Sequence, residues 1–124
     1  MINQVLLYIG AAITFLWGVS HLLPTKNVVK GFGDISTDNK NIITMEWINE
    51  GAALIFTGII VTGVTVLGEQ NNVTAFVYVS SSVFLIVLAV ISLFTGFKVN
   101  FLPFKLCPVL FTLSAALILI GYFA

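Results

Sequence analysis

The sequence predicts an all-α polytopic membrane protein with four transmembrane helices in an antiparallel bundle. Two observations predict this class. Of the 124 residues, 59% are hydrophobic and only 8% are charged, and four long runs of the chain lack Asp, Glu, Lys and Arg. Soluble domains carry about 25% charged residues, so this composition cannot cover a water-exposed surface. We therefore expect the lipid bilayer to surround the folded chain.

The four charge-free runs set the expected spans. They cover residues 1–25, 51–68, 70–97 and 106–124. At about 1.5 Å per residue, roughly 20 helical residues cross a hydrocarbon core of about 30 Å. The expected spans, within one domain of residues 1–124, are therefore 4–23, 43–67, 74–97 and 103–123. A long polar loop, residues 24–42, separates the first two.

The connections and small residues indicate how the spans pack. Pro24 ends the first span because it has no amide hydrogen to continue the helix. The connection 68–72 is so short that we expect the second and third spans to form a tight antiparallel hairpin. In the first span Gly10, Thr14 and Gly18 recur every four residues. This spacing allows close approach of a neighbouring helix.

The charges predict orientation and exclude one class of partner. Net charge is zero and all five basic residues are lysines, so nothing points to nucleic acid, whose phosphates favour the forked arginine side chain. The lysines lie in the first and third loops, at positions Lys26, Lys30, Lys40, Lys98 and Lys105. These loops share one side of a four-span protein. The positive-inside rule predicts that loops one and three are cytoplasmic and both termini outside.

Three ionisable residues at the lysine-rich end are the candidate catalytic residues: His21, Glu46 and Glu50. Glu46 and Glu50 are four residues apart, so they share one helical face. Glu50 lies about 10 Å beyond the expected start of the second span, where a carboxylate requires a neighbour, a proton or water. His21 continues the small-residue face of the first span. One acid with one histidine is sufficient for proton transfer to or from a lipophilic substrate.

Further residues at this end complete an expected polar funnel that opens to the cytoplasm and closes on a hydroxyl-lined interior. The candidate binding residues are Trp17, Asp34, Asn39, Trp47 and Thr57. Plainer interpretations exist for several candidates. Tryptophans are enriched at membrane interfaces, Glu46 fits an acidic first helical turn, and His21 fits a polar residue at a helix end.

We expect no cofactor and no metal. The spacing Glu46-x-x-x-Glu50 lacks the Glu-x-x-His partner of carboxylate di-iron helices, although two glutamates and a histidine are donors that a divalent metal accepts. The one cysteine, Cys107, excludes an intramolecular disulfide and a CxxC pair. Only its position near a loop favours Cys107 as a nucleophile paired with His21.

Three functions fit these observations. The first is a membrane-embedded enzyme or binding protein for a lipophilic molecule, with Glu50 and His21 as proton carrier or polar anchor. The second is an accessory subunit of a larger membrane complex, indicated by the small size, short outer loops and small-residue faces. The third is proton-coupled transport by a homo-oligomer, indicated by an acid accessible from one side of the membrane.

Overall fold

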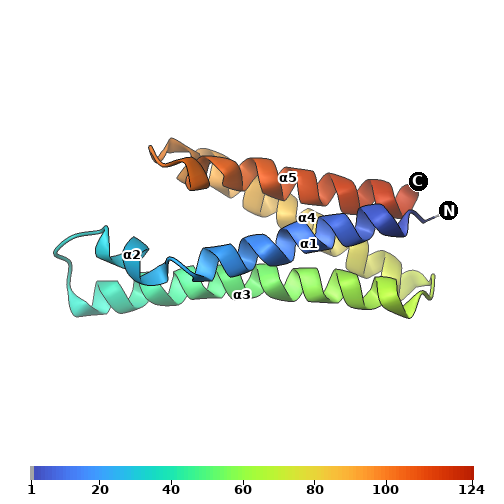
Figure 1. Cartoon of the computed structure of the whole chain (residues 1–124), viewed down its shortest axis with the longest axis horizontal. Helices are drawn as coiled ribbons and strands as arrows, with labels where there is room; N and C mark the ends of the chain where they lie inside the picture. Colours follow the sequence, from blue (N-terminus) through green and yellow to red (C-terminus); the bar gives the residue numbers. More distant parts are fainter. Residues whose placement is uncertain (1) are drawn as a thin grey trace.

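The computed structural model describes residues 2–124, which contain helices and no strand. The four long helices are α1 (Gln4–Leu22), α3 (Thr37–Leu67), α4 (Asn72–Phe94) and α5 (Leu102–Phe123). They run alternately up and down the molecule (Figure 1). A short helix, α2 (Thr25–Lys30), follows α1, and a 3₁₀ turn, η1 (Gly96–Lys98), follows α4.

All four long helices are long and apolar enough to cross a membrane. Large apolar side chains cover their outer surfaces, as exposed residues such as Leu16, Phe56, Phe76 and Ile120 illustrate. An apolar outer surface of this extent is unfavourable in water. In a bilayer, lipid chains contact it instead. The predicted all-α fold with four spans is confirmed, and the chain is an integral, multi-pass membrane protein.

Helix α3 begins earlier than the span that hydropathy predicted from residue 43. Its first residue is Thr37, because the Ser36 side chain accepts a hydrogen bond from the Asn39 amide at 3.1 Å and so caps the helix. The predicted loop 24–42 therefore contains α2 and the first turns of α3. Hydropathy indicates where the apolar part of a helix begins, and α3 begins six residues before that point.

The long helices pack as two pairs, α1 with α3 and α4 with α5, and α1 joins the pairs by packing on α5. The predicted hairpin of the second and third spans is therefore wrong, because α3 and α4 contact each other little. Only their connection is tight: Gly68 ends α3 with φ of 71°, and Asn71 and Thr74 form a capping box at the start of α4.

Glycines hold α1 close to its two neighbours. A Cβ atom on Gly18 would lie 2.8 Å from the Gly51 carbonyl oxygen, so the backbones of α1 and α3 nearly touch there. A Cβ atom on Gly10 would lie 3.1 Å from the Ser114 carbonyl oxygen of α5. The small-residue pattern of the first span thus serves both interfaces, with Gly18 against α3 and Gly10 against α5.

The two ends of the bundle differ in how the pairs meet. At one end both termini lie together (Figure 1), and the Asn3 amide donates to the Gly121 carbonyl at 2.8 Å. At the other end, beside α2, the α1–α3 pair diverges from the α4–α5 pair (Figure 1). The candidate site lies at this diverging end, which is also the end that carries the lysines.

Candidate functional site

The close contact between α1 and α3 brings His21 and Glu50 together. Because the helices are antiparallel and nearly touch at Gly18 and Gly51, the residues just after Gly18 lie opposite those just before Gly51. His21 Nε2 lies 3.2 Å from Glu50 Oε2. The histidine side chain is 7% exposed and the glutamate side chain 36% exposed. The pair therefore joins a buried imidazole to a carboxylate that reaches the surface.

Trp47 fixes the orientation of His21. Its indole ring stacks on the imidazole, with ring centroids 3.8 Å apart and planes inclined by 16°. The indole Nε1 also donates a hydrogen bond of 2.6 Å to the His21 carbonyl oxygen. This carbonyl belongs to the last turn of α1, where the helix that Pro24 ends leaves carbonyl groups without helical partners. Trp47 thus satisfies the end of α1 and holds the imidazole in place.

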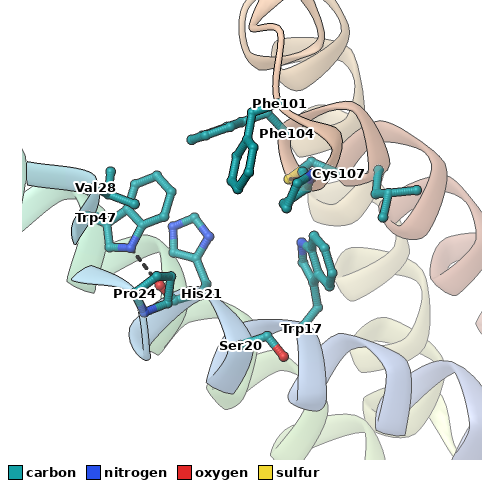
Figure 2. Close-up of a pocket in the computed structure, with 11 residues that line it drawn as sticks. Trp17, Ser20, His21, Pro24, Val28, Trp47, Phe101, Phe104 and Cys107 are labelled. Atoms are coloured by element: carbon teal, nitrogen blue, oxygen red, sulfur yellow. Dashed lines mark hydrogen bonds between the residues drawn. The ribbon is translucent and has the colours of Figure 1, made fainter. Parts of the chain in front are cut away.

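The imidazole lines a cavity of about 330 Å³ between the two helix pairs. This volume falls within the range of about 300–1,000 Å³ that small-molecule pockets occupy. Figure 2 shows side chains from α1, α2, α3 and the start of α5 around the cavity. Its lining includes Trp17, His21, Val28, Trp47, Phe104 and Cys107. The walls are therefore largely aromatic and apolar, and not the hydroxyl-lined polar funnel expected from the sequence.

Two ring nitrogens at this cavity are buried without a hydrogen-bond partner, His21 Nε2 and Trp17 Nε1. His21 Nε2 is close to Glu50 but lacks the alignment of a hydrogen bond. Figure 2 shows the nitrogen-bearing edge of Trp17 facing the side of the cavity where Cys107 lies. Nearly all buried polar groups are paired, and leaving one unpaired costs about 1–3 kcal/mol. Of the two, Trp17 Nε1 is a donor available to a ligand, whereas His21 Nε2 faces Glu50.

Of the residues predicted from the sequence, four meet at this site. Trp17, His21 and Trp47 line the cavity, and Glu50 contacts His21 from outside the lining. His21 was predicted as an ionisable residue and the two tryptophans as binding residues, and the packing of α1 on α3 brings all three to one cavity.

The other four predicted residues lie elsewhere. Glu46 and Asn39 are exposed on α3 and do not line the cavity. Asp34 lines a separate cavity on the other side of α2. Thr57 is buried, but its hydroxyl donates to the Ala53 carbonyl at 2.8 Å within the same helix. The structure does not gather these four residues with His21.

The sequence analysis missed the wall that α5 contributes. Phe104 meets Trp47 edge to face, with ring centroids 5.7 Å apart, and Phe101 lies 6.0 Å from Phe104. Two phenylalanines three residues apart at the start of a helix were the available signal. In the sequence, however, aromatic residues at the end of a membrane span are also typical of an ordinary interfacial belt, so this spacing alone did not indicate a cavity wall.

The site has the parts of a proton relay. An imidazole accepts a proton at one ring nitrogen and releases one from the other, and Glu50 contacts Nε2 on the exposed side. Within residues 2–124, no three His, Cys, Asp or Glu side chains come close enough to hold a metal ion. Comparison with protein families, curated proteins and solved structures finds no match to this chain.

Proposed function

We propose that the cavity binds a small lipophilic molecule and that His21 and Glu50 exchange a proton with it. The observation that carries this proposal is the buried His21 imidazole, which lines an aromatic cavity while its Nε2 lies 3.2 Å from Glu50. A buried histidine stacked on Trp47 needs no carboxylate for packing alone. The carboxylate gives it a proton donor or acceptor at the surface of the molecule.

The contacts support one route for the proton. The Glu50 side chain is 36% exposed whereas the imidazole is shielded, so we assign to Glu50 the exchange of protons with water. A proton moves from Glu50 to Nε2 as the proton on Nδ1 moves to the ligand, and the reverse sequence deprotonates the ligand. Trp17 supplies a second donor, its Nε1–H, for an oxygen of the bound molecule.

We place this site on the cytoplasmic side of the membrane. All five lysines lie at this end, in or beside the connections from α1 to α3 and from α4 to α5, and an excess of lysine marks the cytoplasmic side. A lipophilic ligand reaches the cavity from the bilayer, between the diverging helix pairs. Protons reach Glu50 from the cytoplasm.

The chain provides its own reporter for binding. Trp17 and Trp47 are the two tryptophans of the protein, and both line the cavity. A suitable probe is para-nitrophenol, a lipophilic weak acid whose absorbance reports its ionisation. We expect saturable quenching of tryptophan fluorescence in detergent micelles, accompanied by ionisation of the bound phenol. Quenching that does not saturate, as for free tryptophan in the same micelles, would overturn the binding proposal.

Two matched variants separate binding from proton transfer. Glu50→Gln keeps the size of the side chain and removes its basicity, so quenching should persist while ionisation of the bound phenol is lost. Glu46→Gln makes the same change one turn away on an exposed residue, and should behave as the unmodified protein. Unchanged ionisation in Glu50→Gln would show that the pair does not act as a relay.

A further inference from the structure

A second cavity, of about 510 Å³, lies against α2 and the first turns of α3. Three of the five lysines line it, Lys26 and Lys30 from α2 and Lys40 from α3. Its only acidic lining residue is Asp34, so the cavity carries a formal surplus of two positive charges. Helix α2 separates this basic cavity from the aromatic one, since Val28 lines the aromatic cavity and Val29 the basic one.

The lysine ammonium groups of the basic cavity have no ionic partner. Among residues 2–124 the one close pair of opposite ionisable groups is His21 with Glu50. Asp34 therefore lines the same cavity without pairing with any of the three lysines. Like charges gathered around a hollow repel each other, and an anion between them relieves that repulsion. An anion that enters this cavity therefore meets three ammonium groups that no carboxylate of the described chain already pairs.

The position of the cavity along the helices indicates where this anion resides. Helix α2 follows Pro24, at the end of the first charge-free run. Lys40 precedes Glu46 and Glu50 on α3, and the next charge-free run begins only at Gly51. The basic cavity therefore lies just beyond the apolar part of both helices. In a bilayer this is the level of the lipid phosphates.

We propose that the basic cavity is a binding site for a phosphate ester that carries a hydroxylated group, as in the headgroup of an anionic phospholipid. Lysines bind phosphate as point charges, and basic pockets beside membrane helices hold such headgroups. Asp34 accepts a hydrogen bond from a headgroup hydroxyl, and the cavity is large enough for the phosphate and a short polyol. This site does not depend on the function proposed for the aromatic cavity.

Native mass spectrometry of the whole chain in an uncharged detergent tests the site. We expect one retained molecule of phosphatidylglycerol and no comparable retention of phosphatidylcholine, whose ammonium group neutralises its own phosphate. Lys26→Gln, Lys30→Gln and Lys40→Gln should each weaken retention about fivefold, the effect of one basic residue near an anionic headgroup. Lys30→Arg should retain the lipid because it keeps the charge and donates to phosphate.

Lys98→Gln is the matched control. It removes one positive charge from the same end of the molecule, in a loop that does not line the basic cavity. Retention within twofold of the unmodified protein supports a defined site. An effect equal to that of Lys30→Gln would overturn it in favour of general attraction by net charge, and so would equal retention of phosphatidylcholine. Because all four lysines are exposed, their variants are expected to fold, which thermal unfolding verifies.

Competition with a soluble phosphate ester, glycerol phosphate, identifies the source of the bound phosphate. If glycerol phosphate displaces phosphatidylglycerol, the headgroup alone supplies the binding and a soluble phosphate ester is a ligand. If it does not displace the lipid while the lysine variants still weaken retention, the ligand is a phospholipid. Failure of all three lysine variants to weaken retention would overturn the proposal.

Discussion

The two ends of the bundle differ in how their buried polar groups are hydrogen-bonded. At the end that holds both termini, the Tyr78 hydroxyl is fully buried and lies 2.9 Å from Thr65 Oγ1. Thr65 in turn donates to the Val61 carbonyl at 2.7 Å, so Tyr78 is the donor of the pair. Tyr122 packs beside Tyr78, with ring centroids 5.4 Å apart. The polar groups here are paired and the helices are in contact.

At the diverging end the helices separate and the pairing is incomplete. His21 Nε2 and Trp17 Nε1 are as well buried as the Tyr78 hydroxyl, yet neither has a hydrogen-bond partner. Among the described residues, one other buried side-chain polar atom lacks a hydrogen-bond partner: the hydroxyl of Ser82, in the middle of α4. The comparison shows that one end of the bundle pairs its buried hydroxyl groups, whereas the other end leaves two buried ring nitrogens without hydrogen-bond partners.

The largest expected effect comes from separating α1 and α3. Gly18→Ala places a methyl group 2.8 Å from the Gly51 carbonyl oxygen, a backbone atom that cannot turn aside. Overpacking of this kind costs about 1–3 kcal/mol, and the displaced helices would also separate His21 from Glu50. Unfolding by SDS in mixed micelles measures the free energy. Gly63→Ala on α3 is the control, because its added Cβ meets nothing within 4 Å; equal losses in both variants would contradict this account.

The two tryptophans of the aromatic cavity should respond differently to the same substitution. Trp47→Phe removes the donor to the His21 carbonyl and the stacked indole, so we expect a loss of about 1–2 kcal/mol in the free energy of unfolding. Trp17→Phe removes a donor that has no partner. In ligand-free protein it should leave stability unchanged or raise it. The same SDS titration compares them, and a larger loss for Trp17→Phe would show that its Nε1–H is already paired.

A smaller effect is expected at the closed end. Tyr78→Phe removes one buried hydroxyl while Thr65 keeps its bond to Val61. The expected loss is about 0.5–1.5 kcal/mol, the net value of one hydrogen bond, with para-nitrophenol binding unchanged. Tyr8→Phe makes the same change on a tyrosine that is 37% exposed and should have no effect on stability. If Tyr78→Phe altered ligand binding, the two ends would not be independent.

Much of the fold followed from particular residues. The charge-free runs predicted four helices, and Gln4–Leu22, Asn72–Phe94 and Leu102–Phe123 begin and end within three residues of the expected spans. The four-residue spacing from Gly10 to Gly18 predicted a packing face, and both glycines contact neighbouring helices. The expected span from residue 43 missed the first turns of α3, because hydropathy does not score the polar segment that follows the Ser36 cap.

The candidate site was predictable only in part. An acid and a histidine placed at the same end of apolar helices stand out in the sequence, and the structure brings Glu50 and His21 together. The α5 wall with Phe104 was not predictable, because nothing in the order of the residues states that α5 packs on α1. The expected hairpin failed for the same reason: a short connection limits the distance between helix ends and does not specify which faces meet.

The sequence alone determined that this chain is a four-helix membrane protein with its ionisable groups concentrated at one end, since hydrophobicity and charge act residue by residue. Only the tertiary structure decided that α3 pairs with α1 and that the two helix pairs diverge around an aromatic cavity. The physical reason is that partner choice among apolar helices depends on the fit of surfaces, such as Gly18 on Gly51. In lipid, where hydrophobicity does not distinguish one apolar neighbour from another, close packing makes that choice.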